Sequence, residues 1–198
     1  MRLRAMLAVG GVLLTLPSAG QEIGWQADAI ARALEFHADN LPELCVPPQE
    51  SAMVPASFEL QIGEETAARQ ALLVEFPCQI GAYSETAVYL LSDQLGQISE
   101  VFFPSPQFEV AYSGEGESAR VEEIAITETL NRREVINPSY DADSRTITER
   151  NKWRELGDAY ATTRWGFKDG RFQIMYFAVD ATFDGKDNPQ ILIDEDIW

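Results

Sequence analysis

The sequence predicts a mainly β protein (α+β) with one N-terminal helix, arranged as an antiparallel β-sandwich or an open barrel. Three observations support this prediction. An apolar pattern of helical period occupies residues 22–38, and from residue 57 onward the period changes to two. Turn residues then separate many short strands at hairpin spacing, and no Gly- or Ser-rich linker divides the chain. A helix packed against antiparallel sheets fits this order of elements.

The first residues have the layout of a secretory signal peptide. Arg2 and Arg4 precede an uncharged apolar run at 6–16, which is too short for a membrane span of ~20 residues. Pro17 ends the run and small residues follow, so we expect a signal peptide over 1–20 with cleavage after Gly20. A buried N-terminal helix is the alternative. We expect residues 21–198 to form a single exported β-rich domain, periplasmic or secreted, without membrane insertion after cleavage.

The helix is expected to end at Asn40-Leu41-Pro42, and its spacing places Ile23, Ala27, Ile30, Leu34 and His37 on one apolar face. Strands are expected at 57–62, 71–76 (ended by Pro77), 86–92, 97–103, 108–112, 121–129, 134–136, 146–148, 160–167, 171–179 and 191–193. The Asp-Gly step at 169–170 is the strongest hairpin signal, because glycine accepts the positive φ of such turns.

The chain is strongly acidic, with 32 Asp and Glu against 15 Lys and Arg, and a formal net charge of −17. Removal of residues 1–20 takes away two arginines and no acids, which moves the charge from −17 to −19. Such a surface repels phosphate backbones, so no nucleic-acid partner is expected. A cationic protein or peptide is electrostatically favoured as a partner. Solubility alone is the alternative explanation of the charge.

Cys45 and Cys78 are the only cysteines. An even count behind an export signal favours a disulfide between them. Closing this loop would contribute roughly 3–4 kcal/mol through the unfolded state. Free thiols and half of a metal site are the alternatives. Because His37 is the only third soft ligand, neither a zinc site nor another cofactor is expected.

Most catalytic templates are missing from the sequence. His37 is the single histidine, and neither a nucleophile elbow nor a phosphate-binding glycine loop occurs. We expect no catalytic role for His37, which lies on a helix face. Among the carboxylates, Glu155 and Asp158 lie near Trp153 and Trp165, a combination that would suit a glycosidase. Acids on a loop rim beside core tryptophans are the alternative.

Two acidic loops contain the oxygen ligands that calcium prefers. The first is DADSRT at 141–146, and the second is DGKDN at 184–188. Neither completes the twelve-residue calcium-loop pattern with glycine at position six and glutamate at position twelve. The same residue types also favour turns for local backbone reasons. No metal ligand is assigned, and a calcium-stabilised structural module remains one alternative.

Two groups of motifs resemble a known family. PCQIGAY at 77–83 is similar to a Pro-Cys-x-x-Gly-Ala-Tyr signature. NPSYDADSRTI at 137–147, RELGD at 154–158 and RWGF at 164–167 are similar to a turn, an Arg-x-x-Gly-Asp step and a Trp-containing strand. Over residues 40–180 this order resembles the domain-of-unknown-function family 1176, a family of exported proteobacterial proteins. A cysteine usually follows the Gly-Asp step in that family and pairs near the C-terminus. Here Ala159 takes its place and the late cysteine is absent, so the second bridge is missing.

The resemblance singles out Arg154, Gly157, Asp158 and Trp165 as a candidate motif. It transfers no catalytic residue, because the family has no established activity. We expect Arg154 or Arg164 to pair with Asp158 where the chain turns between strands, with Gly157 in an unusual backbone conformation. A ligand site is the alternative.

These observations predict a non-enzymatic periplasmic binding or interaction protein. One version is the capture of a cationic envelope protein such as a lysozyme. The alternatives are a carboxylate-based hydrolase that acts on cell-wall glycans through Glu155 or Asp158, and the calcium-stabilised module.

Overall fold

The structure is a computed structural model that describes residues 19–42, 45, 55–63, 68–114 and 120–198. The predicted signal peptide lies outside the described residues except for its last two positions, which belong to the first helix. Most of the connection around 45–55 and the tip of the acidic loop at 115–119 also lie outside them. Among the described residues, no helix combines the length and apolarity needed to cross a membrane.

One helix and twelve strands are found in the described part of the chain. They are α1 (Ala19–Asn40), β1 (Ala56–Ile62), β2 (Arg69–Ile80), β3 (Glu85–Asp93), β4 (Ile98–Glu100), β5 (Phe103–Ser113), β6 (Arg120–Arg132), β7 (Val135–Ile136), β8 (Ser139–Asp141), β9 (Thr146–Lys152), β10 (Tyr160–Lys168), β11 (Arg171–Asp180) and β12 (Gln190–Asp194).

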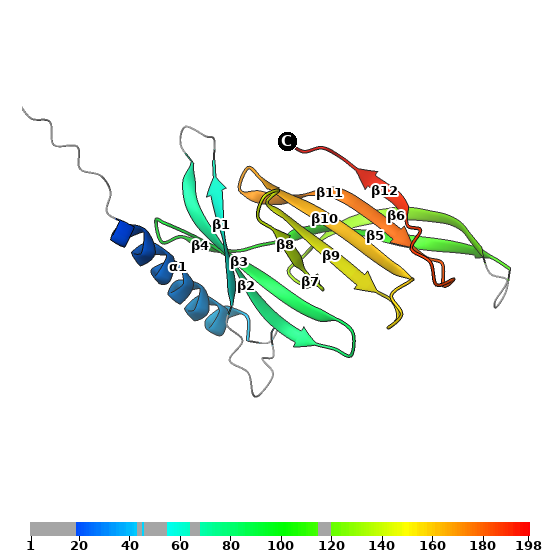
Figure 1. Ribbon diagram of the computed structural model, residues 1–198, viewed down its shortest axis with the longest axis horizontal. Coiled ribbons are helices and arrows are strands. Elements are labelled where there is room, and N and C mark those ends of the chain that lie inside the picture. Colours follow the sequence, from blue (N-terminus) through cyan, green and yellow to red (C-terminus); the bar gives the residue numbers. More distant parts are fainter. Residues whose placement is uncertain (1–18, 43–44, 46–54, 64–67, 115–119) are drawn as a thin grey trace, which may run out of the picture.

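The strands form three antiparallel sheets. The first sheet has the order β1-β2-β3-β4, with β7 paired to β3. The second has the order β12-β11-β10-β9-β8, and the third is the two-stranded β5–β6 hairpin. The predicted fold class is therefore confirmed: the chain is mainly antiparallel β with a single N-terminal helix, and the sheets do not close into a barrel (Figure 1).

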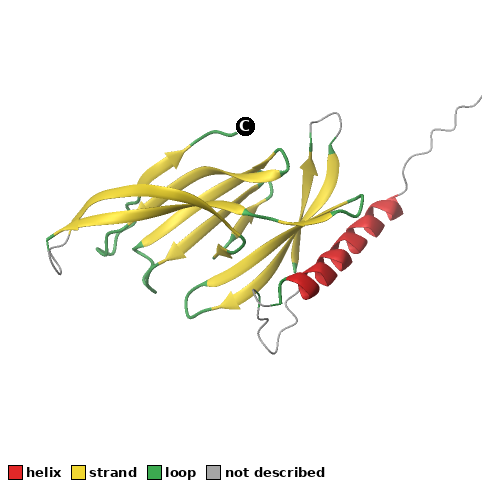
Figure 2. Ribbon diagram, turned by 180° about the vertical axis from the view of Figure 1, so that it is seen from behind, coloured by secondary structure: helices red, strands yellow, loops and turns green. Residues whose placement is uncertain are grey.

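The first sheet is the central layer of one half of the molecule. Helix α1 covers one of its faces, and the second sheet covers the other (Figure 2). Along β2, Leu72 and Val74 face the helix, whereas Ala71 and Leu73 face the second sheet. Because this strand is buried on both faces, residues 71–74 are all apolar and do not alternate with polar residues.

Aromatic side chains fill the core between the two sheets. The Phe103 ring centroid lies 5.1 Å from that of Trp165 and 5.0 Å from that of Phe172. Trp165 is completely buried, and its indole N–H donates a hydrogen bond of 2.6 Å to the carbonyl of Pro104. This bond satisfies the one polar group of the buried indole, so Trp165 stabilises the core.

A β-bulge in β11 separates the part of the second sheet that packs on this core from the part that packs on the β5–β6 hairpin. Arg164 pairs with Tyr176 and the next residue of β10 pairs with Ile174, which leaves Met175 unpaired. The bulge shifts the alternation of β11, because Ile174 packs against the first core whereas Phe177 lies in a separate core under β5–β6. One face of the second sheet thus contacts both the first sheet and the hairpin.

The buried face of α1 differs from the prediction. Ala29 and Ala33 are completely buried against the first sheet, whereas Ala27 is exposed and Leu34 is 46% exposed. The predicted face was therefore wrong at these two positions. The small side chains of Ala29 and Ala33 let the helix pack closely on the sheet, and the larger Leu34 therefore faces away from this contact.

Strand β2 also continues beyond its predicted end. Pro77 pairs with Ala87, and the next pair joins Gln79 to Thr86, so Cys78 is the extra residue of a bulge. Proline has no N–H to donate to the ladder, and a bulge is one of the places where a sheet accepts it. The expectation that Pro77 ends the strand was wrong for this reason.

Candidate functional site

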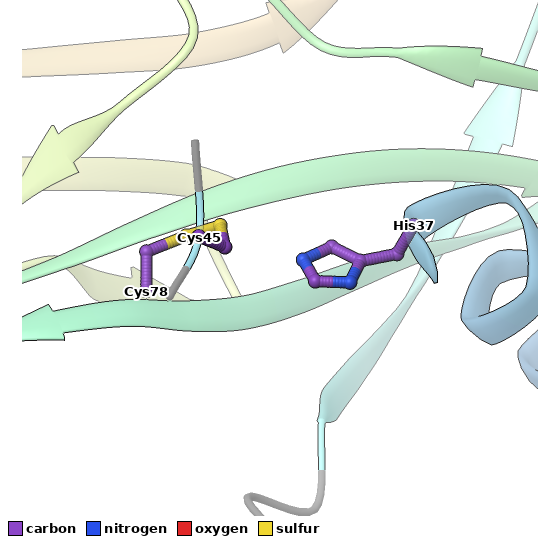
Figure 3. A group of neighbouring side chains, drawn as sticks. All are labelled: His37, Cys45 and Cys78. Carbon is purple, nitrogen blue, oxygen red and sulfur yellow. A yellow bond between two sulfur atoms is a disulfide. The ribbon is translucent and has the colours of Figure 1, made fainter. Parts of the chain in front are cut away.

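Cys45 and Cys78 form a disulfide, as predicted. The bond joins the segment after α1 to β2, and both cysteines are buried. His37, in the last turn of α1, stacks on Phe76 with 4.3 Å between the ring centroids. Figure 3 shows the imidazole ring pointing toward the disulfide. Burial lowers the pKa of His37 and so favours the neutral imidazole.

Arg154 and Asp158 form an ion pair in the turn between β9 and β10. The Arg154 Nε–H donates to Asp158 Oδ1 over 2.7 Å, and Arg154 Nη2 donates to Oδ2. Oδ2 also accepts the backbone N–H of Gly185 at 2.8 Å. These hydrogen bonds, that of Arg154 first, hold the pKa of Asp158 well below its usual range. The pair thereby fastens the β9–β10 turn to the loop that follows β11.

The other two residues of the candidate motif have different surroundings. Gly157 adopts φ 71°, and its N–H donates to the Arg154 carbonyl at 3.0 Å, closing the same turn. Trp165 lies apart from the turn, in the core between the sheets. Arg164 is exposed on β10, and its guanidinium carbon lies 5.4 Å from the Tyr176 ring centroid. The structure therefore assigns the partner role to Arg154 and brings three of the four motif residues together.

The two carboxylates considered for glycan hydrolysis have different surroundings. Glu155 is exposed, and Asp158 is only 5% exposed and accepts three hydrogen bonds. A general acid needs a raised pKa, whereas that of Asp158 is lowered. Trp165 is buried, and Trp153 packs beside Phe108 with 6.0 Å between the ring centroids. Asp158 is therefore held in its turn as an ionised hydrogen-bond acceptor and not as a general acid.

The first acidic loop folds as a local turn. Asp141 Oδ1 accepts the backbone N–H groups of Asp143 and Ser144 at 2.9 and 3.0 Å. These bonds, with that of Ser144 the stronger cause, lower the pKa of Asp141. The carboxylate thus satisfies backbone donors of its own turn, as aspartate does in such turns.

The second acidic loop is held by side chains in a similar way. Asp184 Oδ1 accepts the backbone N–H of Lys186 at 3.0 Å, and Asp187 accepts the Tyr160 hydroxyl. In the part of the chain that the structure describes, neither loop gathers three carboxylates around one point. The only three-residue group of metal-ligand types found there is His37 with the two cysteines.

The outer face of the β5–β6 hairpin carries acids that the sequence analysis did not single out. In the register of the hairpin, Glu109 lies opposite Ala125, Glu123 opposite Ala111, and Glu128 opposite Gln107. This register puts the three glutamates on one face of the hairpin, and all three are exposed. We call them the acidic hairpin face.

The acidic hairpin face is not neutralised by basic side chains. Phe108, Val110 and Ile124 occupy the other face of the hairpin and pack toward the second sheet. None of the ion pairs found among the described residues includes Glu109, Glu123 or Glu128. The acids placed among apolar residues in 108–112 and 121–129 were a visible signal. The bulges at Glu122 and Thr127, however, concealed which acids would share a face.

Exposed apolar side chains lie on the same hairpin. Ile126 is 38% exposed and Leu130 is 46% exposed. Tyr112 is also exposed, although its hydroxyl donates a 3.0 Å hydrogen bond to the carbonyl of Ala181. Ile126 pairs with Phe108 and Tyr112 with Val121, so both lie on the face opposite the glutamates, and only Leu130 shares the acidic hairpin face.

A groove of about 520 Å³ lies where β1 to β4 meet the β10–β11 turn. Arg69 and Asp93 line it and pair with each other at 3.1 Å. Asp93 Oδ1 also accepts the backbone N–H groups of Leu95 and Gln97, each at 2.9 Å. The charged groups of the groove are thus used within the protein, which leaves little for recognition of a small polar ligand.

Comparison with known proteins identifies a family. No curated protein matches the chain, and no solved structure does either. Residues 52–187 match the family described as "Protein of unknown function (DUF1176)". The match runs from just before β1 to the loop after β11 and includes the PCQIGAY, RELGD and RWGF motifs. It covers more than half of the chain, and the protein therefore belongs to the DUF1176 family.

Proposed function

We propose that this protein is a non-enzymatic binding protein of the bacterial periplasm that engages a cationic protein or peptide. The acidic hairpin face carries the proposal, because its three exposed glutamates share one face and have no ion-pair partner among the described residues. The buried disulfide supports an oxidising compartment, which fits export by the expected signal peptide.

Electrostatics favours a cationic partner. Like charges on one face repel each other, and a bound cation relieves this repulsion while the net charge of −17 speeds encounter. Leu130, two residues from Glu128 along β6 and therefore on the same face, adds apolar area of the kind found in protein interfaces. In Figure 1 the hairpin lies at the end of the molecule opposite α1, where a large partner can reach it.

Side chains, rather than strand pairing, provide the contact in this proposal. Among the described residues β6 pairs only with β5, so its second edge has no strand partner there. Bulges at Glu122 and Thr127 interrupt this strand, and glutamates flank it. Both features protect edge strands from adding another strand. We therefore assign recognition to the hairpin's outer face and not to its edge.

The test compares two variants of equal net charge. Glu109→Gln/Glu123→Gln/Glu128→Gln removes the acidic hairpin face. Asp28→Asn/Glu35→Gln/Asp39→Asn removes three exposed acids from α1 and is the matched control. Calorimetric titration uses a cationic lysozyme as the probe, first at low salt and then at about 0.15 M ionic strength, where the Debye length is about 8 Å.

We expect the hairpin variant to bind the probe at least about tenfold more weakly, a loss of about 1.4 kcal/mol, and the helix variant to bind as the unmodified chain does. An equal loss in both variants would mean that net charge alone attracts the probe. Absence of binding at low salt by the unmodified chain would remove the assignment to lysozyme-like partners.

A further inference from the structure

We propose that the chain, once its disulfide is reduced, binds one Cu(I) ion through His37, Cys45 and Cys78. The ligand atoms of these three residues lie within 4.8 Å of one another. They come from three parts of the chain: the last turn of α1, the segment that follows it, and the bulge of β2. Figure 3 shows the His37 ring directed at the sulfur pair, so the imidazole and both sulfur atoms are close together.

The imidazole is an available ligand. His37 Nε2 is buried and has no hydrogen-bond partner among the described residues. A buried nitrogen without a partner is costly, because it has lost water and gained nothing in exchange. Stacking on Phe76 holds the ring in place without using either nitrogen. A metal ion bound at this ring would therefore need little rearrangement of the helix.

The donor set selects a soft metal. Two thiolates and one imidazole suit Cu(I) or Zn²⁺ better than a hard cation such as Mg²⁺ or Ca²⁺. Zn²⁺ in proteins takes four ligands, and a three-residue site must add water as the fourth. Leu41, Val88 and Phe76 belong to the same buried apolar cluster as both cysteines. Cu(I) is satisfied with three soft ligands and needs no water ligand, so these apolar surroundings favour it over Zn²⁺.

The disulfide decides whether the site exists. A dithiol reductant of the thioredoxin type would transfer two electrons and two protons to the Cys45–Cys78 bond. That bond breaks to give two thiols, and the reductant becomes a disulfide. Binding of Cu(I) then releases both thiol protons, because thiolates are the ligands. Oxidised protein has no thiolate to offer, so copper binding and the disulfide exclude each other.

The test titrates the full chain with Cu(I) without oxygen, in competition with a chromophoric Cu(I) chelator. We expect one copper per reduced chain and no uptake by the oxidised chain. His37→Phe keeps an aromatic ring against Phe76 but removes the nitrogen, and should weaken binding at least about tenfold. Cys45→Ser/Cys78→Ser should abolish it. X-ray absorption should show two sulfur ligands and one nitrogen ligand.

Three results would overturn the proposal. The first is an equal Cu(I) affinity of the reduced chain and the Cys45→Ser/Cys78→Ser variant. The second is a copper ion coordinated by sulfur alone. The third is a reduced chain that binds one Zn²⁺ but does not bind Cu(I). Circular dichroism of the reduced chain shows whether reduction itself unfolds the protein. If it does, Cu(I) must refold the reduced chain, because a ligand that binds only the native state stabilises that state. A chain that stays unfolded in saturating Cu(I) contradicts the site equally.

Discussion

Buried aspartates on both sides of the loop after β11 hold that loop in place. Asp158 accepts the Gly185 N–H in addition to the two hydrogen bonds from Arg154. Asp180, which is 1% exposed, accepts the Thr182 N–H at 3.0 Å and the Asn188 N–H at 2.8 Å. The hydrogen bonds to Asp158 stabilise its ionised form. At the residue scale, part of the acidity therefore serves the fold and not a ligand.

Asp158→Asn tests this role through pH. Because the folded pKa of Asp158 lies below its ordinary value of 3.8, its ionised form stabilises the fold above about pH 4. This contribution is lost as the pH falls toward the folded pKa. We expect Asp158→Asn to melt at a lower temperature than the unmodified chain at pH 7, with a difference that shrinks as the pH falls below about 4.

Melting temperatures measured across the acid range check this prediction, and Glu155→Gln, an exposed acid of the same turn, is the control. Glu155→Gln should leave the melting temperature nearly unchanged. A difference for Asp158→Asn that does not depend on pH would show that its ionisation is not what stabilises the turn.

At the scale of elements, α1 shows how packing selects a helix face. The apolar spacing of the helix includes Leu34, yet the completely buried positions are Ala29 and Ala33. Their methyl groups allow the helix backbone to lie close to β2 and β3, while Trp25 and Phe36 pack at the sides of the contact. A larger side chain at the alanines would push the helix away from the sheet.

Ala33→Leu should therefore destabilise the protein by about 1–3 kcal/mol, because the core has no room for the added atoms. Leu34→Ala should change the free energy of unfolding by no more than about 0.5 kcal/mol, because Leu34 is largely exposed. Urea unfolding of both variants measures the two values. A larger loss for Leu34→Ala than for Ala33→Leu would restore the helix face that the apolar spacing predicts.

At the scale of the whole molecule, the disulfide and the hairpin lie in different cores. Cys45 and Cys78 belong to the cluster between α1 and the first sheet, whereas Phe108 and Ile124 belong to the cluster under β5–β6. The bond closes a loop with a sequence separation of 33, which restricts the unfolded chain. Stability and partner binding should therefore respond separately to loss of the disulfide.

Cys45→Ala/Cys78→Ala should lower the free energy of unfolding by roughly 3–4 kcal/mol, the value expected for a loop of this length. The same variant should keep its affinity for the cationic probe, since the acidic hairpin face does not contact this cluster. Urea unfolding and calorimetric titration of one preparation give both values. Unchanged stability would show that the bond does not restrict the unfolded state, and lost affinity would show that the two ends are coupled.

The sequence by itself determined the local elements, the disulfide and the family. Helical and two-residue periods located α1 and most strands, since those periods come from the backbone geometry of each element. The Asp-Gly turn was equally local: Asp169 and Gly170 have φ of 54° and 78°, as such a hairpin requires. β8, at Ser139–Asp141, was missed, because three residues among turn formers show no period.

Only the tertiary structure decided which faces are buried and which residues meet. A strand period shows that two faces exist, but bulges at Cys78, Thr127 and Met175 shift the alternation partway along a strand. The shared face of Glu109 and Glu123 depends on the register between two strands. The approach of His37 to the disulfide depends on the packing of α1 on the first sheet. Both are long-range consequences of packing, which no local pattern contains.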